Sequence, residues 1–228
     1  MKYPACLAGM VLLVGCFSRQ PEERSDYQKY EEHLGKLHDK LLAVSVHIGG
    51  GTGEPIYVSN GDTYFLTAKH VVGESFIHDV TIYKNESFQK TKGTVVALSP
   101  EFDLAIVRVS GIFDCFDIMS DEDYSKLRQC EIVLAAGWPR AQPAIISVGL
   151  IRNTFYKEPA RPEIWLYHSA SGWFGFSGGP VIHLATGLLV GTIVEIRGHN
   201  GEMDSSRMIA VPAPQIRKFV KQFLPRVK

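Results

Sequence analysis

The sequence has no surplus of charge of either sign. Its 24 lysines and arginines balance 24 aspartates and glutamates, so the formal net charge of the 228-residue chain is zero. Without a positive surplus, no overall field would draw the protein to nucleic acid or to an anionic surface. The sequence therefore predicts no nucleic-acid partner.

Motifs that bind metals and nucleotides are also missing. The eight histidines show no His-Glu-x-x-His spacing, and the cysteines form no Cys-x-x-Cys pair. Gly49, Gly50, Gly51 and Gly53 form a glycine-rich run, but its spacing misses the dinucleotide fingerprint and no Gly-Lys-Ser/Thr follows. These glycines are interpreted as a turn, and the sequence predicts neither a metal nor a cofactor.

The uncharged run at the start of the chain is too short to span a bilayer. Residues Ala5 to Gly15 follow Lys2 and have the shape of a secretory signal. The run ends in Leu13-Val14-Gly15-Cys16, which resembles the lipobox of bacterial lipoproteins. In that interpretation residues 1–15 are removed, and an acylated Cys16 anchors the protein to a membrane, facing the periplasm or the cell exterior. The alternative is a plain signal peptide with a chance cysteine, which would give a secreted protein.

Few cysteines remain after such processing. Cys115 and Cys130 would stand in an oxidising compartment, where disulfides form and persist. Because the sequence gives no distance between them, a disulfide and two separate buried thiols are both open alternatives.

A mostly polar segment occupies residues 16–41. Its larger apolar side chains recur at three- and four-residue steps: Tyr27, Tyr30, Leu34, Leu37 and Leu41. This period predicts one amphipathic helix, which could be a spacer from the membrane, a coiled-coil element or a helix docked on the next domain. Gly35 in its middle costs about 1 kcal/mol relative to alanine. It disfavours the coiled coil and leaves the docked helix or the spacer.

Short apolar runs alternate with turn residues from residue 42 onward. The first series is Val44–Ile48, Pro55–Ser59, Thr63–Ala68, Val80–Lys84 and Gly93–Leu98. The second series is Glu131–Ala135, Ile145–Arg152, Glu163–His168, Pro180–Leu184, Leu188–Ile196 and Met208–Val211. Regularly spaced short strands are typical of an all-β sandwich or barrel. Two groups of about six strands predict two barrels, at about 42–112 and 129–212, with a short helix at 121–127 and a C-terminal helix at 214–224.

Three short strings carry the chemistry. They are Thr67-Ala68-Lys69-His70, Asp103-Leu104-Ala105-Ile106-Val107 and Gly175-Phe176-Ser177-Gly178-Gly179-Pro180. A serine hydroxyl is a poor nucleophile at neutral pH, so it needs a base beside it and a third group that orients the base. The order and spacing of the strings resemble the chymotrypsin-like serine proteases, in particular the bacterial trypsin-like, HtrA-type branch. The resemblance covers roughly Leu42 to Leu224.

This resemblance implies both a fold and a set of roles. The fold would be two antiparallel six-stranded β-barrels in a protease domain at 42–228, with the catalytic cleft between them. Ser177 would be the nucleophile, His70 the general base and Asp103 the group that orients it. The backbone N–H groups of Gly175 and Ser177 would form the oxyanion hole, while Gly178 and Gly179 permit a tight turn.

Two departures from the family pattern bear on activation and specificity. Phe176 stands where digestive and clotting members have the aspartate of their zymogen switch, so that switch is absent. Ser171 replaces the aspartate that selects basic side chains, which argues against a strict Arg or Lys preference. The resemblance also implies that the substrate would pair, as an added strand, with Val194, Glu195 and Ile196. Ile196 would favour small or aliphatic side chains in the primary pocket.

The sequence thus predicts a membrane-tethered serine endopeptidase that acts on proteins or peptides outside the cytoplasm. Phe176 and the neighbouring Trp173 and Phe174 motivate a second hypothesis, a catalytically silent pseudoprotease that holds peptides in the cleft. A third is a hydrolase of esters, because the same acyl-transfer machinery serves both reactions.

Overall fold

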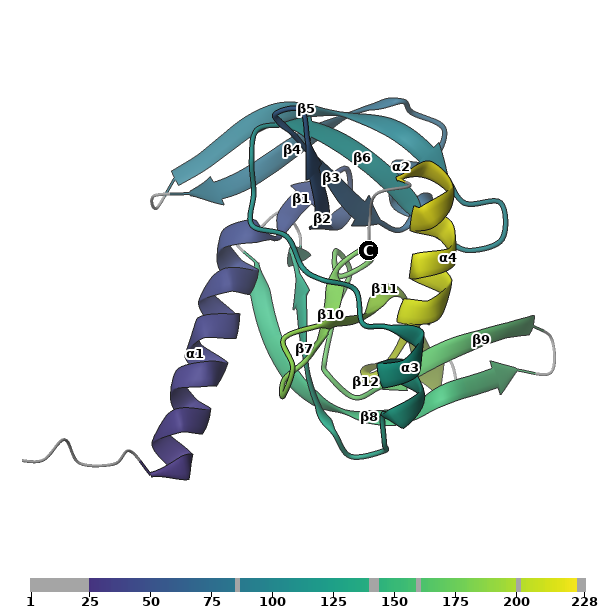
Figure 1. Cartoon of the computed structure of the whole chain (residues 1–228). Helices are drawn as coiled ribbons and strands as arrows, with labels where there is room; N and C mark the ends of the chain where they lie inside the picture. The colour runs from purple at the N-terminus through teal and green to yellow at the C-terminus, as the bar shows by residue number, and fades with distance from the viewer. Residues whose placement is uncertain (1–24, 85–86, 140–143, 159–160, 200–201, 225–228) are drawn as a thin grey trace, which may run out of the picture.

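The computed structural model describes residues 25–84, 87–139, 144–158, 161–199 and 202–224 of the chain. The predicted signal peptide and Cys16 lie outside the described residues and stay predictions. Two barrels make up most of the described chain, with helix α1 (Asp26–Val44) before them and helix α4 (Ala213–Phe223) after them (Figure 1). No helix in this part of the chain is both long enough and apolar enough to cross a membrane.

Both barrels are closed sheets of six strands in which every neighbouring pair is antiparallel. Barrel one has the order β1-β2-β3-β6-β5-β4. Its strands are β1 (Val46–Ile48), β2 (Gly51–Ser59), β3 (Asp62–Thr67), β4 (Ile77–Lys84), β5 (Ser87–Leu98) and β6 (Ala105–Ser110). Barrel two has the order β10-β11-β12-β9-β8-β7. Its strands are β7 (Ile132–Gly137), β8 (Ile145–Glu158), β9 (Arg161–His168), β10 (Pro180–His183), β11 (Leu189–His199) and β12 (Glu202–Pro212). The predicted all-β fold of two six-stranded barrels is confirmed.

Side-chain alternation explains why these segments form barrel strands. In β6, Val107 and Val109 are buried in the core of barrel one, while Arg108 and Ser110 are exposed. Ile106, on the other face from Val107, joins the apolar cluster that extends into barrel two. Full burial of one such aliphatic side chain contributes about 1.5–3 kcal/mol. The same strand therefore closes one barrel and packs it against the other.

The glycine run before and within β2 corrects the sequence prediction. Gly49 and Gly50 form a turn, with Gly49 at φ 56°, but Gly51 and Gly53 are strand residues. A Cβ on Gly51 would lie 2.5 Å from the carbonyl oxygen of Ser177 in barrel two. The prediction of a turn over the whole run is wrong, because these later glycines allow close approach between segments.

Helix α1 (Asp26–Val44) is docked against both barrels (Figure 1). Ser25 and Gln28 form a capping box at its start. Leu37, Leu41 and Val44 are buried, and the helix contacts β4 of barrel one and β8 of barrel two. The docked arrangement is therefore the one that the structure has. The helix runs past residue 41 to Val44, so the strand that the sequence places from Val44 begins only at β1.

Helices α3 (Asp121–Lys126) and α4 (Ala213–Phe223) lie where the sequence predicts helices. The buried stripe of α4 includes Ile216, Phe219 and Val220. Lys218 on the exposed side of α4 forms an ion pair with Glu101, in the barrel-one loop that precedes Asp103. Helix α4 thus connects the end of barrel two to a loop of barrel one.

The two cysteines of the described chain do not form a disulfide. Cys115 is a half-buried free thiol, and Cys130 is an exposed one. Burial raises the pKa of the Cys115 thiol to about 11. The structure therefore has separate thiols, of which only Cys115 is partly buried.

Candidate active site

His70 and Asp103 come from the ends of two paired strands. Thr67 at the end of β3 is paired with Ala105 at the start of β6, so the residues just beyond them are neighbours. His70 lies in the short helix α2 (Lys69–Val72), directly after β3. Its backbone N–H donates to Asp103 Oδ1 (2.9 Å), and its Nδ1 is hydrogen-bonded to Oδ2 (2.5 Å). The structure brings this predicted pair together.

The hydrogen bonds between His70 and Asp103 shift the pKa values of both side chains. The side-chain hydrogen bond to Asp103 raises the pKa of His70, burial opposes it, and the charges of Asp103 and Glu195 add to the increase. Burial by itself would raise the pKa of Asp103, but hydrogen bonds from the side chain and backbone of His70 hold it below its ordinary value. Asp103 is therefore ionised at neutral pH and accepts from Nδ1–H. Neutral His70 then has a free lone pair on Nε2.

Ser177 lies in the loop before β10, and this loop is held from both barrels. In barrel two, the N–H of Gly178 donates to the carbonyl oxygen of Ile193 (2.7 Å), and the N–H of Gly179 donates to that of Phe176 (2.8 Å). From barrel one, the N–H of Thr52 donates to the carbonyl oxygen of Ser177 (2.8 Å). The serine loop is thus fixed at the junction of the two barrels.

The serine loop also lies directly against the segment that carries His70. A Cβ on Gly178 would lie 2.2 Å from Thr67 Oγ1 and 2.8 Å from the backbone nitrogen of Ala68. The φ of Gly178 is 82°, so glycine is needed here for its conformation as well as for space. Ser177 is therefore placed beside the end of β3, a few residues from His70.

The backbone N–H groups of Gly175 and Ser177 have no acceptor in the described part of the chain. Gly175 has φ 101°, and a Cβ there would lie 2.2 Å from the carbonyl oxygen of Trp138. The N–H of Phe176, between them, donates to the carbonyl oxygen of Trp173 (3.0 Å) and closes a turn. The two N–H groups predicted for the oxyanion hole thus donate no hydrogen bond to any described residue.

Phe176 is buried rather than inserted into the space beside the serine. Its side chain is 3% exposed. A Cβ on Gly137 would lie 2.3 Å from its ring, and one on Gly172 would lie 3.1 Å from it. These two glycines make room for an aromatic ring, so the bulk of Phe176 is accommodated in barrel two. Trp173 and Phe174 are exposed at 41% and 63%.

The predicted substrate-binding residues lie on two segments beside the serine loop. Val194, Glu195 and Ile196 are on β11, immediately after the carbonyl of Ile193 that holds Gly178. Val194 is buried, Ile196 is partly exposed, and the Glu195 carboxylate forms an ion pair with Arg197 (3.1 Å). Ser171 is exposed, and its carbonyl oxygen accepts from Ser147 (2.6 Å).

A polar seam between the barrels, formed by Thr52, Glu54, Thr67 and Thr192, has no signal in the sequence. These four residues are fully buried. Thr67 Oγ1 donates to the Thr52 carbonyl (2.6 Å), Thr52 Oγ1 to that of Gly175 (2.6 Å), and Thr192 Oγ1 to Glu54 Oε1 (2.7 Å). Burial raises the pKa of Glu54 well above its usual range, against the hydrogen bond from Thr192. Thr52 stands in a glycine run and Glu54 before a proline, both patterns that are typical of turns.

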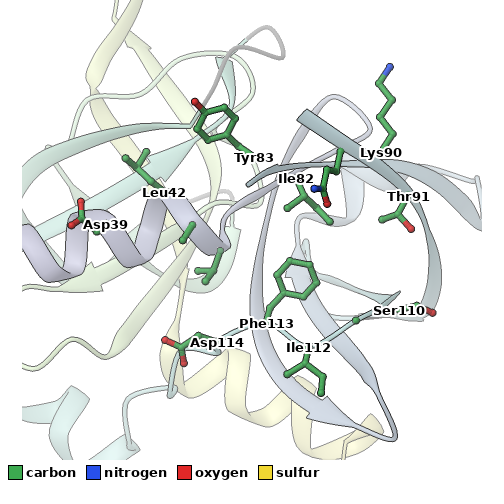
Figure 2. A pocket seen from close by; sticks show the side chains of 14 residues that line it. Asp39, Leu42, Ile82, Tyr83, Lys90, Thr91, Ser110, Ile112, Phe113 and Asp114 are labelled. Atoms are coloured by element: carbon green, nitrogen blue, oxygen red, sulfur yellow. The ribbon is translucent and has the colours of Figure 1, made fainter. Parts of the chain in front are cut away.

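A pocket of about 770 Å³ lies away from these residues, beside the C-terminal end of α1 (Figure 2). Its lining combines apolar side chains such as Leu42, Ile82 and Phe113 with the charged Asp39 and Asp114. None of its lining residues belongs to the candidate active site. Within the described ranges, no group of three or more histidine, cysteine, aspartate or glutamate side chains gathers as a metal site would require.

Two closed barrels, with a histidine–aspartate pair on one and a Gly-Phe-Ser-Gly-Gly loop on the other, define a chymotrypsin-like fold. Over residues 51–191 the sequence matches the trypsin-like peptidase domain. The chain belongs to this family, and its fold is that of the HtrA-type branch.

Similar proteins agree with this assignment. The chain is 25% identical over 178 residues to a probable periplasmic serine endoprotease, DegP-like, of Chlamydia pneumoniae, which covers 76% of this chain. This chain spans only about a third of that relative's length (34%). The structure superposes on the HtrA-type protease AlgW with a tripeptide at a TM-score of 0.67 and 20% identity, covering 84% of this chain and 63% of AlgW. It superposes on the MamO protease domain from Magnetospirillum magneticum at a TM-score of 0.65 and 21% identity, covering 79% of this chain and 97% of the MamO domain. At such identities the two superpositions establish the fold alone.

Proposed function

We propose that the protein is a serine endopeptidase that hydrolyses peptide bonds with Ser177, His70 and Asp103. The observation that carries this proposal is the pair of hydrogen bonds that holds His70 on Asp103. It leaves Nε2 as the base, while the Ser177 loop packs against the segment before His70. Membership of the trypsin-like peptidase family supports the same assignment.

In the proposed reaction, Ser177 Oγ attacks the scissile carbonyl carbon while its proton moves to Nε2 of His70. Asp103 holds Nδ1–H and stabilises the imidazolium. The N–H groups of Gly175 and Ser177 bind the oxyanion of the tetrahedral intermediate, and removal of one such donor typically costs about 10²–10³ in kcat. His70 then protonates the leaving amine, which departs. Water attacks the acyl-enzyme in the same way and returns Ser177.

The proposed substrates are proteins or peptides in extended conformation. Such a chain would pair with the backbone of Val194, Glu195 and Ile196, which gives binding that depends little on sequence. Ser171 in place of an acidic residue favours a non-basic side chain in the primary pocket. The DegP-like relative is an endoprotease, and AlgW carries a tripeptide, which support peptides as the substrate class.

Digestion of unfolded casein tests the endopeptidase proposal. We expect internal cleavage of casein, with the new amino termini identified by mass spectrometry. The same preparation is also tested on a small ester, because an esterase would hydrolyse the ester without cleaving casein at a comparable rate. Ester hydrolysis with intact casein would instead identify an esterase. A folded protein that binds casein peptides but cleaves neither substrate would be a pseudoprotease and would contradict the proposal.

We also propose that Cys16 is acylated and tethers the protease to a membrane of the cell envelope. Several acyl chains, at about 0.8 kcal/mol per buried methylene, hold a protein firmly to a bilayer. Cys16→Ser is expected to move the protein from the membrane fraction to the soluble fraction or to block its processing. Cys6→Ser serves as the control. Unchanged fractionation, with no lipid mass on the wild-type protein, would rule out the anchor.

A further inference from the structure

One residue of barrel one is hydrogen-bonded to the carbonyl groups of Gly175 and Ser177, the two residues on either side of Phe176 in the serine loop. The backbone N–H of Thr52 donates to the carbonyl oxygen of Ser177 (2.8 Å), and its Oγ1 donates to that of Gly175 (2.6 Å). Gly175 and Ser177 are the residues whose N–H groups are assigned to the oxyanion hole. Thr52 thus fixes the peptide groups next to both proposed donors.

The direction of the Thr52 hydroxyl proton follows from its second partner. The N–H of Trp138 donates to Thr52 Oγ1 (2.9 Å), so this oxygen accepts on one side. A hydroxyl has a single proton, which is left for the carbonyl of Gly175. Thr67 Oγ1 in turn donates to the Thr52 carbonyl (2.6 Å), and Thr52 is fully buried. The side chain therefore has one hydrogen-bonding arrangement and no exposure to bulk solvent.

Close packing leaves the loop little room to compensate for a loss of this contact. A Cβ on Gly175 would lie 2.2 Å from the carbonyl oxygen of Trp138, and one on Gly178 would lie 2.2 Å from that of Thr52. Without the hydroxyl, the buried Gly175 carbonyl keeps, among the described residues, only the longer contact from the N–H of Trp138 (3.3 Å). An under-satisfied buried carbonyl favours rotation of the peptide toward other partners.

We propose that Thr52 is a positioning residue that couples barrel one to the serine loop and holds Gly175 and Ser177 in the orientation that the transition state needs. This inference rests on the proposed endopeptidase function. Thr52 does not touch substrate, so its effect appears in kcat rather than in KM.

The chain offers a matched control, Thr63, near the start of β3 and at the opposite end of that strand from Thr67. Thr63 is also fully buried, and its Oγ1 donates to the Gly111 carbonyl (2.7 Å) and accepts from the N–H of Phe113 (3.1 Å). It lies four residues before Thr67, at about 13 Å along the strand. Thr63→Val therefore removes one donated and one accepted hydrogen bond, as Thr52→Val does, but at a site without contact with the serine loop.

The test compares T52V, T52S and T63V by kinetics on a peptide substrate and by amide hydrogen exchange over residues 173–179. For T52V we expect kcat to fall about 10- to 100-fold with KM within about threefold, and exchange of these amides to rise about tenfold or more. T52S keeps the hydroxyl and should stay within about threefold of the wild type, and T63V should match the wild type in both readouts. Should T52V fail to fold, T52A carries the same expectations.

Two results would overturn the proposal. One is a folded T52V protein with wild-type kcat and wild-type exchange. The other is an equal change in T52V and T63V, which would mean that buried threonines affect only stability. A wild type that cleaves no peptide would refute the endopeptidase function instead, and the exchange comparison of T52V with T63V still decides whether Thr52 holds the loop.

Discussion

Replacement of Ser177 by alanine is expected to lower kcat by about 10⁶-fold, as loss of the nucleophile does in serine proteases of other folds. Without Oγ no acyl-enzyme can form, and only general positioning and oxyanion stabilisation remain. These leave a rate about 10³–10⁴ above that of water alone. The variant should fold normally, because the loop is held by backbone groups that alanine retains.

Steady-state hydrolysis of a peptide substrate measures this effect, with circular dichroism as the check on folding. Ser125→Ala is the matched control, because its hydroxyl is exposed on α3 and bonds only within that helix (to the Glu122 carbonyl, 2.6 Å). Wild-type activity in S125A and a kcat about 10⁶-fold below wild type in S177A are the expected pattern. Retention of more than about one per cent of kcat in S177A would be incompatible with a serine nucleophile at this position.

The second large effect is expected for Asp103→Asn, with kcat lowered by about 10⁴-fold. Asp103 accepts hydrogen bonds from both the backbone N–H and Nδ1 of His70. An asparagine amide can present N–H toward Nδ1, which favours the tautomer with the proton on Nε2. His70 in that tautomer cannot accept the proton of Ser177.

The same variant should change the pH dependence. The hydrogen bond to Asp103 raises the pKa of His70 in the wild type, so its imidazole becomes neutral, and active as a base, only as the pH rises through that elevated pKa. Removal of the carboxylate lowers this pKa, so the residual kcat/KM of D103N should reach its plateau at lower pH than in the wild type. Asp79→Asn is the control, because Asp79 pairs with Lys92 on the surface of barrel one (2.6 Å). A D103N profile with the wild-type midpoint would contradict the assignment of Asp103.

Most of the fold follows from local patterns that the sequence displays openly. Alternating residues such as Val107, Arg108 and Val109 mark strands because one face of each strand must be buried. The sequence also predicts His70 and Asp103, because His70 follows one strand, Asp103 precedes another, and these two strands are paired. Signals of this kind need only a few neighbouring residues.

The features that the sequence does not predict depend on contacts between distant segments. Gly51 resembles a turn glycine, yet it is a strand residue paired with Ile48, and glycine is needed there because Ser177 leaves no room for a Cβ. Phe176 looks disruptive until Gly137 and Gly172 are seen to leave room for its ring. Thr52 is one polar residue among glycines, and nothing local indicates that it bonds to the serine loop of the other barrel. Long-range packing of this kind has no periodicity for a sequence pattern to reveal.

Reaction with a fluorophosphonate probe tests the central claim most directly. The probe reports an activated serine and a working oxyanion site together, because its phosphoryl oxygen occupies the same position as the oxyanion. The folded wild-type protein should gain the mass of one adduct, which peptide mapping should place on Ser177, and S177A should gain none. A folded wild type that stays unlabelled, or an adduct on another serine, would contradict the assignment of Ser177, His70 and Asp103 as a catalytic triad.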